Sequence, residues 1–187
     1  MNVVSKYFNW LQKDNPKNIV ESYPEIDDQK ETSVPGVYIV GDLTGIPLLK
    51  LAADGGAKIV RQLFSDQKMA LEKEKNSDIY DLVIIGAGPA GISTAIECKK
   101  KGINYIVLES NRILNTIENF PKEKPITLRP DGVPLELPLE MNDGTKETLL
   151  DELTSQIGRE GLNFEVGTFV QKLSRKDNII HIETNKS

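Results

Sequence analysis

The chain has 187 residues, of which 39% are hydrophobic, and its net charge is -5, a balance that is ordinary for a domain with its own core. The acidic balance argues against nucleic acid as the main partner, because phosphate backbones attract basic surfaces. No apolar stretch reaches the roughly 20 residues that cross a bilayer, and the N-terminal sequence lacks the pattern of a signal peptide. The single cysteine, Cys98, cannot form an internal disulfide, so we expect a cytoplasmic protein with no membrane partner.

The first part of the chain is expected to form a helix, a loop and then a strand–helix unit. Apolar residues at helical spacing predict a short helix over 3–13, which with the polar loop after it makes an N-terminal segment, residues 1–31. The apolar run GVYIVGD (36–42) predicts a buried strand, and PLLKLAADGGAKIVRQLF (47–64) predicts a helix that its two central glycines weaken. Together with a charged helical extension and linker, these elements make a second segment, residues 32–78.

The third segment, residues 79–187, begins with alternating strands and helices. An apolar strand over 82–85 precedes a helix over 89–101, and a second strand, 105–108, ends at Glu109. This order predicts an α/β fold with a parallel sheet flanked by helices.

Beyond the second strand the pattern weakens and then resumes. Residues 121–144 are rich in proline and irregular, whereas residues 145–159 predict a helix capped by its first residue, a threonine. Strands are expected near 163–166, 168–173 and 178–184, which indicates a small β-meander at this end.

Three glycines, Gly86, Gly88 and Gly91, spell G-x-G-x-x-G between the first apolar strand and its helix. In this setting the pattern predicts a Rossmann-type turn that binds a dinucleotide. We expect Gly86 to permit the tight turn, Gly88 to let a pyrophosphate approach the backbone, and Gly91 to let the helix pack closely on the strand. The helix N terminus would then offer free N–H groups and partial positive charge to the diphosphate. The alternative is a tight turn that binds no ligand.

An acidic residue ends the second strand, 18 residues after Gly91. Glu109 is therefore placed to accept hydrogen bonds from ribose hydroxyls. A carboxylate there would repel a 2′-phosphate, so the site should prefer an unphosphorylated adenosine ribose. The glycine pattern and the acid do not by themselves distinguish FAD from NAD.

Two stretches resemble one family. The segment 80–121, with GAGPAG, VLES and IENFP, resembles the N-terminal FAD segment of the thioredoxin reductase-like pyridine nucleotide-disulfide oxidoreductases, closest to the bacillithiol-disulfide reductase branch. Residues 32–60 resemble the second FAD motif of the same superfamily, a strand ending in Gly-Asp followed by a helix. The resemblance implies a Rossmann-like FAD-binding domain in which Asp42 bonds a ribityl hydroxyl. It also implies that backbone N–H groups near Leu48 and Leu49 face the flavin ring.

The residues expected to bind FAD come from both stretches. Arg112 is placed either to touch the adenine or a phosphate or to form a surface salt bridge, and the resemblance brings Asn119 near the flavin. We name no catalytic residue, because the redox chemistry belongs to the cofactor, and no metal site. The full set is Gly86, Ala87, Gly88, Pro89, Ala90, Gly91, Glu109, Ser110, Arg112, Asn119, Gly41, Asp42, Leu48 and Leu49.

The order of the two FAD motifs is the reverse of the family's order. In the family the Gly-Asp motif lies at the C-terminal end, whereas here it comes first. We therefore predict a circularly permuted FAD domain. Strand 37–41 would lie parallel to strand 81–85, with helix 47–64 joining them as a right-handed β-α-β crossover.

The resemblance implies an FAD-dependent oxidoreductase that passes electrons from NAD(P)H through FAD to an unidentified acceptor. The second glycine motif of the family's NAD(P)H domain is absent, so NAD(P)H is expected to bind outside this segment. We interpret residues 79–187 as an incomplete N-terminal part of the FAD domain, belonging either to a longer enzyme or to a degenerate relative. The implied partners are an electron-acceptor protein or domain and a second copy in a homodimer.

Thiol chemistry has weak support in the sequence. The Cys-x-x-Cys of thioredoxin reductases is missing, and Ala90 stands where the bacillithiol branch carries a cysteine. Cys98 is better interpreted as a small core residue than as a nucleophile. Two other functions stay open, a non-catalytic nucleotide-binding or interaction module and a fragment of an NAD-binding dehydrogenase.

Overall fold

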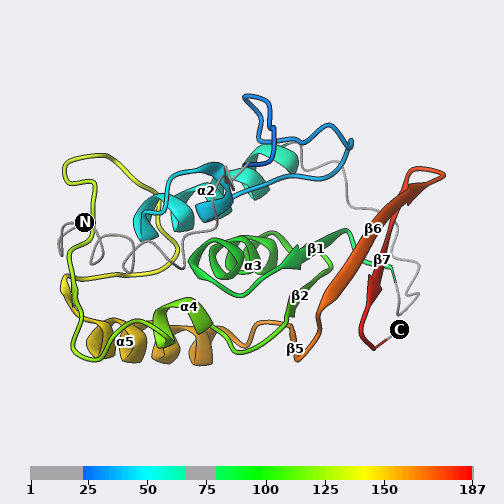
Figure 1. Cartoon of the computed structure of the whole chain (residues 1–187). Coiled ribbons are helices and arrows are strands. Elements are labelled where there is room, and N and C mark those ends of the chain that lie inside the picture. Colours follow the sequence, from blue (N-terminus) through cyan, green and yellow to red (C-terminus); the bar gives the residue numbers. More distant parts are fainter. Residues whose placement is uncertain (1–22, 66–78, 187) are drawn as a thin grey trace, which may run out of the picture.

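The computed structural model describes residues 23–65 and 79–186 (Figure 1). The helix expected over 3–13 and most of the charged extension and linker expected over 65–78 lie outside these residues. The described elements are η1 (Gly41–Thr44, a 3-10 helix), α2 (Leu49–Leu63), β1 (Leu82–Ile85), α3 (Pro89–Lys101), β2 (Tyr105–Glu109), α4 (Asn115–Glu118), β3 (Pro125–Ile126), β4 (Gly144–Thr145), α5 (Lys146–Glu160), β5 (Phe164–Val166), β6 (Val170–Lys176) and β7 (Ile179–Thr184).

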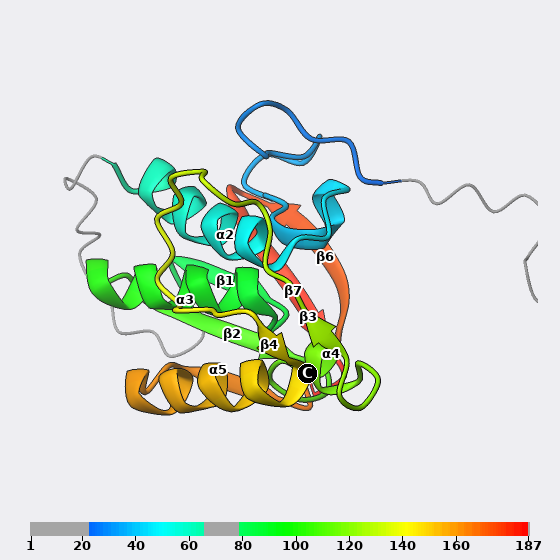
Figure 2. The same ribbon diagram turned by 90° about the vertical axis from the view of Figure 1, so that its left-hand side faces the viewer.

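A three-stranded parallel sheet in the order β1-β2-β5 lies at the centre of the fold. Helix α3 connects β1 to β2, and it lies between α2 and α5 in both ribbon views (Figure 1, Figure 2). The antiparallel β6–β7 hairpin lies behind the sheet, away from these three helices. The α/β fold with a parallel sheet flanked by helices, predicted from the sequence, is confirmed.

Local signals in the sequence set both ends of α3. Pro89 occupies its first turn, where a missing N–H costs nothing. Gly102 follows the last residue with φ 70°, and its N–H donates to the carbonyls of Cys98 and Lys99. The helix coincides with the predicted range 89–101. Residues 91–98 are all buried, because α3 is covered on several sides.

Helix α5 begins at a capping box. The Thr145 hydroxyl accepts the N–H of Thr148, and the Thr148 hydroxyl accepts the N–H of Thr145 in return. The helix runs one residue later at each end than the predicted 145–159. Its inward side chains Leu149 and Leu153 are fully buried, so this face packs into the core.

The apolar core has two parts that meet at α3. One part joins α3, α4, α5 and the stretch 126–141, and includes Ile92 and Ile96. The other joins α2, α3 and the sheet, and includes Val60 and Val107, both fully buried. Because α3 contributes to both parts, a displacement of this helix would disturb the whole core.

The proline-rich stretch is irregular, as predicted, and it packs against the core. Residues 133–141 alternate apolar and other side chains, as in a strand, although no strand is formed there. Leu139 and Met141 on the apolar side are buried in the core. This stretch therefore covers the helices with side chains, without a sheet partner.

Ion pairs and hydrogen bonds of charged side chains connect α2 to α3 and to the proline-rich stretch. The Arg61 guanidinium donates to both carboxylate oxygens of Glu97, over 3.1 and 2.9 Å, and also pairs with Glu136. These hydrogen bonds lower the pKa of the buried Glu97 carboxyl. Asp54 accepts the backbone N–H of Glu136 at 3.1 Å. The buried carboxylates are thus paired, as burial of charge requires.

The strand expected over 37–41 is not part of the sheet, so the predicted β-α-β crossover to β1 is wrong. Tyr38 forms a single antiparallel bridge with Glu31, and the backbone of 30–39 bonds within itself, through Thr32 N–H to Val37 O and Ile39 N–H to Lys30 O. A local hairpin therefore uses the groups that the sheet would need. Tyr38 and Val40 of this run still pack against the core.

The predicted terminal meander also differs in detail. β5 joins the parallel sheet beside β2, with Leu108 opposite Glu165, so that of these last three strands β6 and β7 alone form an antiparallel pair; β3 and β4, earlier in the chain, form another. Asp177 and Asn178, between β6 and β7, both have positive φ, as a two-residue hairpin turn of type I′ requires. The meander is therefore a single hairpin.

Candidate functional site

Hydrogen bonds to the end of β2 and to the residues before α4 hold the glycine-rich turn between β1 and α3. Gly86 has φ +97°, a conformation that side chains rarely adopt, and its N–H donates to Leu108 O at 2.8 Å. The next residue, Ala87, donates its N–H to the Glu109 carboxylate at 2.7 Å and accepts the N–H of Leu114 at 2.9 Å. The turn is therefore fixed in place by its neighbours.

The other two glycines have contrasting surroundings. A Cβ added at Gly91 would lie 2.0 Å from the Gly86 carbonyl oxygen, so only glycine permits this close packing of helix on turn. A Cβ added at Gly88 would meet nothing within 4 Å. Gly88 has ordinary angles, φ -80° and ψ -178°, so neither backbone strain nor packing explains a glycine there. The open space above Gly88 fits a ligand that approaches the backbone.

The N terminus of α3 faces this turn without a cap. The N-cap residue is Gly88, which has no side chain and therefore makes no side-chain cap. The N–H groups of Ala90 and Gly91, in the first turn, have no carbonyl partner within the helix, as at every helix N terminus. Together with the helix dipole they attract an anion.

Glu109, at the C-terminal end of β2, lies against this turn. Its carboxylate accepts hydrogen bonds from the N–H groups of Ala87 and Asn111 and, at 3.3 Å, from the Ser110 hydroxyl. The residue is 8% exposed. A carboxylate has about four acceptor positions, so one is left for a further donor. The predicted juxtaposition of the acid and the glycine-rich turn is therefore present in the structure.

The Gly-Asp segment lies on the other side of the same turn. A Cβ at Gly41 would be 3.0 Å from the Cβ of Ala90, so η1 contacts the first turn of α3. Asp42 is exposed in η1. Leu48 is the N-cap residue of α2 and has no side-chain cap, while Leu49 packs against the core. The structure thus brings together two motifs that lie far apart in the sequence.

Sequence reasoning missed apolar side chains beside this segment. Leu43 is 60% exposed and Ile46 is 50% exposed, in the stretch between Asp42 and α2. Both side chains are apolar and lie close in sequence to the start of α2, whose N-cap residue makes no side-chain cap. Their position between a Gly-Asp pair and a helix is the signal that would have identified them.

The remaining predicted residues lie along the chain after β2. Ser110 is exposed and bonds Glu109. Arg112 forms an exposed ion pair with Glu118 at 2.9 Å, which is the surface salt bridge that the sequence left open. Asn119 is exposed and follows α4. No described contact of Arg112 or Asn119 reaches the glycine-rich turn.

The comparisons with known proteins bear on this geometry. A profile of the pyridine nucleotide-disulphide oxidoreductases matches residues 83–187, more than half of the chain. The chain belongs to this family. Thioredoxin reductase from Mycoplasma genitalium is 48% identical over 59 residues, and bacilliredoxin reductase Bdr from Bacillus subtilis is 46% identical over 39 residues. The matches cover 28% and 21% of this chain and only 19% and 12% of the two relatives.

A solved structure also resembles the chain. Bacillithiol disulfide reductase Bdr from Staphylococcus aureus is 26% identical, with a TM-score of 0.48, over 56% of this chain and 33% of that one. The resemblance to thioredoxin reductase-like pyridine nucleotide-disulphide oxidoreductases, inferred from the sequence, is confirmed at the level of the family.

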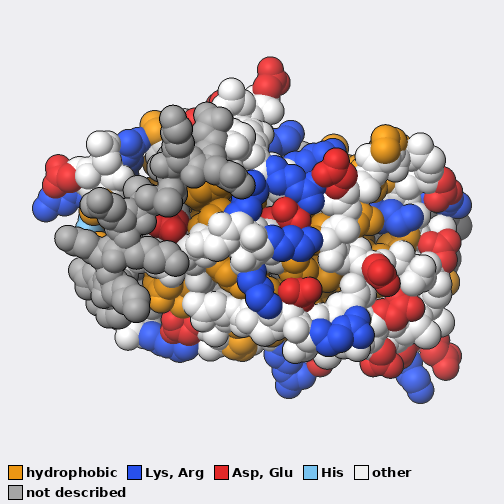
Figure 3. All heavy atoms as spheres, turned by 180° about the vertical axis from the view of Figure 1, so that it is seen from behind, with side chains coloured by type: hydrophobic (Ala, Val, Ile, Leu, Met, Phe, Trp, Pro, Cys, Tyr) orange, Lys and Arg blue, Asp and Glu red, His pale blue; other side chains and the backbone are white. Residues whose placement is uncertain are grey.

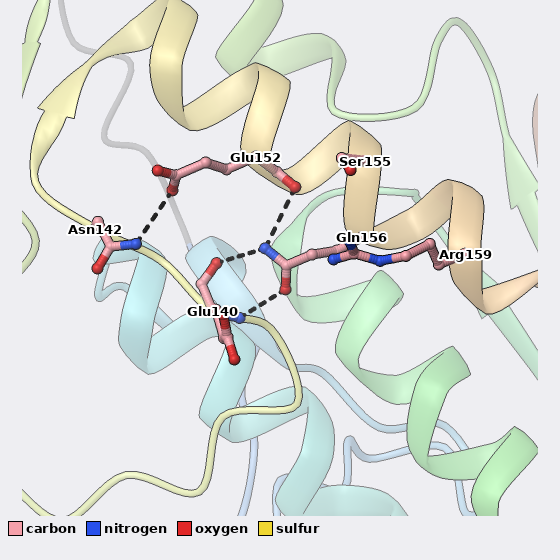
Figure 4. A pocket seen from close by; sticks show the side chains of 6 residues that line it. All are labelled: Glu140, Asn142, Glu152, Ser155, Gln156 and Arg159. Carbon is pink, nitrogen blue, oxygen red and sulfur yellow. Dashed lines mark hydrogen bonds between the residues drawn. The ribbon is translucent and has the colours of Figure 1, made fainter.

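A hollow of about 250 Å³ lies elsewhere on this family member, between α5 and residues 140–142 (Figure 4). The Gln156 amide donates to the carbonyl of Glu140 and accepts its N–H, both at 2.8 Å. Asn142 reaches toward Glu152 at the same place. Gln156 thus binds the proline-rich stretch to α5. These hydrogen bonds account for the polar residues that line the hollow, without a ligand.

The surface seen from behind carries both signs of charge (Figure 3). Lysine, arginine and acidic side chains are interspersed there, with apolar atoms between them. No helix among residues 23–65 and 79–186 is long and apolar enough to cross a membrane. Within the same ranges, no three His, Cys, Asp or Glu residues are grouped to hold a metal ion.

Cys98 is the one thiol of the sequence, and it lies inside the core on α3. Burial, with a smaller contribution from the neighbouring Glu97 carboxylate, raises the pKa of this thiol to about 12. Its environment is that of a small core residue, as the sequence indicates.

We expect Cys98 to be unreactive in the native protein. At pH 8 the thiol stays protonated, because its pKa is far above this pH, and the thiolate is the reactive form. A colorimetric thiol reagent should therefore detect no thiol in the native protein and one per chain after unfolding in guanidinium. Labelling of the native protein at the rate of the unfolded chain would contradict this prediction.

Proposed function

We propose that this chain binds FAD and forms part of an NAD(P)H-dependent flavoprotein oxidoreductase. The observation that supports the proposal is the open space above Gly88, which lies beside an uncapped helix N terminus and a buried carboxylate. A diphosphate binds where it can come close to backbone N–H groups. The adenosine ribose next to it needs a hydrogen-bond acceptor at the end of the neighbouring strand. Both requirements are met within one turn and the strand next to it.

In this proposal the ADP half of FAD binds at the α3 end of the site. The N–H groups of Gly88, Ala90 and Gly91 hold the diphosphate, and Pro89, which has no N–H, fixes the first turn of the helix. Glu109 accepts from the ribose, with Ser110 beside it. Arg112 would have to leave Glu118 to reach the adenine.

The flavin half would extend toward the other segment. Asp42 accepts from a ribityl hydroxyl, and the N–H groups near Leu48 and Leu49 face the ring. Leu43 and Ile46 supply an apolar surface, and Asn119 is a further residue near the ring. Bound FAD would supply hydride and electron transfer between NAD(P)H and an acceptor, while the chain binds and orients it.

The proposal includes the permuted order of the two motifs. The contact of Gly41 with Ala90 and the packing of α2 on α3 support it, because they place the earlier segment at the later turn. NAD(P)H would be held by residues other than those described above. The other proposed partners are an electron-acceptor protein or domain and a second copy of the chain.

Replacing Asp42 with alanine is expected to weaken FAD binding about tenfold, the effect of losing one hydrogen bond to a charged group. ADP affinity should not change, because ADP lacks the ribityl chain. The measurement is flavin fluorescence during titration of the flavin-free protein, with ADP measured by calorimetry.

Two results would argue against the proposal, and a third would limit it to nucleotide binding by this segment. Equal FAD affinity for wild type and Asp42→Ala would remove Asp42 from the site. A colourless protein that binds NADH and not FAD would indicate the NAD-binding dehydrogenase. Flavin that is not bleached by NAD(P)H would favour either a non-catalytic nucleotide-binding module or a segment that needs further residues to hold NAD(P)H.

A further inference from the structure

Two glycines of the earlier segment converge on one residue of the glycine-rich turn. A Cβ at Gly41 would lie 3.0 Å from Ala90 Cβ, and a Cβ at Gly56 would lie 2.1 Å from Ala90 O and 2.9 Å from its carbonyl carbon. The Thr94 hydroxyl lies between the two helices, within donating distance of Ala90 O at 2.9 Å in α3 and of Gly56 O at 3.0 Å in α2. Ala90 is therefore enclosed by η1 on one side and by α2 on another.

The contact with Ala90 is particular to Gly41 and is not shared by the nearby Gly45. Gly45 shares the positive φ of Gly41, +86° against +78°, but a Cβ there meets nothing within 4 Å. Gly41 is also fixed by its own carbonyl, which accepts the Thr44 hydroxyl at 2.8 Å. This hydrogen bond lies within η1 and stabilises the local conformation at Gly41.

We infer that Gly41 is a positioning residue, which sets the distance between Asp42 and the N terminus of α3 through its contact with Ala90. This inference rests on the proposed function. If FAD spans the two segments, its diphosphate lies at the turn that contains Ala90 and its ribityl chain lies beside the residue after Gly41. A side chain larger than alanine at position 90, or any side chain at 41, would separate the two ends of the site.

A double-mutant cycle tests this contact. Gly41→Ala is expected to weaken FAD binding about tenfold. Adding Ala90→Gly, which removes the opposing methyl group, should restore the affinity to within about threefold of the Ala90→Gly single variant. Gly45→Ala is the matched control, because it introduces the same left-handed strain without a contact, and it should change FAD affinity less than about threefold.

Each outcome of the cycle is decisive. Equal losses for Gly41→Ala and Gly45→Ala would assign the effect to backbone strain and overturn the inference, as would a failure of Ala90→Gly to rescue. Thermal unfolding of the same four proteins gives a readout without FAD, since the 41 and 90 substitutions should be non-additive. Wild-type protein that binds no FAD, with non-additive unfolding, would reject the proposed function and the positioning role while leaving the contact intact.

Discussion

Replacing Gly56 with alanine is expected to destabilise the protein by about 3 kcal/mol, a large effect for one methyl group. The added Cβ would lie 2.1 Å from the Ala90 carbonyl oxygen and 2.9 Å from the Thr94 hydroxyl. Neither atom has room to retreat, because Ala90 and Thr94 belong to α3, which packs into both parts of the core. Helices α2 and α3 would have to separate. Urea unfolding followed by circular dichroism measures the loss in the free energy of unfolding.

Gly55→Ala is the matched control for this prediction. Gly55 precedes Gly56 in the same helix, and a Cβ there meets nothing within 4 Å. Alanine should therefore stabilise the protein by about 0.5–1 kcal/mol, the usual gain over glycine inside a helix. If both variants gained stability, α2 would not approach α3 as closely as described.

Replacing Gly88 with valine is expected to abolish most nucleotide binding while leaving the fold intact. The backbone angles at Gly88 suit a β-branched residue, and an added Cβ there has no protein atom within 4 Å. A ligand diphosphate resting on the turn would instead meet two methyl groups. We expect the affinity for both FAD and ADP to fall about 100-fold, or about 2.7 kcal/mol, with the unfolding midpoint unchanged.

The control for this experiment is Gly158→Val in α5. That position is also open, and it lies in a helix away from the turn. It should change neither FAD nor ADP affinity. Unchanged binding by Gly88→Val would mean that the space above the turn does not hold the diphosphate. A lowered unfolding midpoint would mean that the glycine has a structural role.

The elements whose limits depend on local signals could be predicted from the sequence. Pro89 and Gly102 mark the ends of α3, and Thr145 caps α5, because each acts on the backbone within one turn. The run over 37–41 could not be placed in the same way. Its composition indicates burial, which is correct, but the choice of pairing partner depends on a local hairpin that bonds residues 30–39 to one another.

In the candidate site, too, the features set by local sequence could be predicted, whereas those that depend on which helices pack together could not. The tasks expected of Gly86, Gly88 and Gly91 follow from strand, turn and helix in sequence order, and the structure has the geometry for each. Gly56 was interpreted as a weak point of its helix, because a close approach depends on which helix crosses it. The run of small residues AADGGA around Gly56 is the signal for such a crossing. The ligand contacts of Asp42, Arg112 and Asn119 stay predictions.

Because both backbone groups of Ala87 are already bonded, an incoming nucleotide would not have to organise the turn that receives it. Loops that order on binding lose part of their interaction energy to entropy, and this one would avoid that loss. Association should then be limited by encounter rather than by rearrangement, with a single kinetic phase. The amide of Ala87 should also exchange its hydrogen with solvent slowly even before any cofactor arrives.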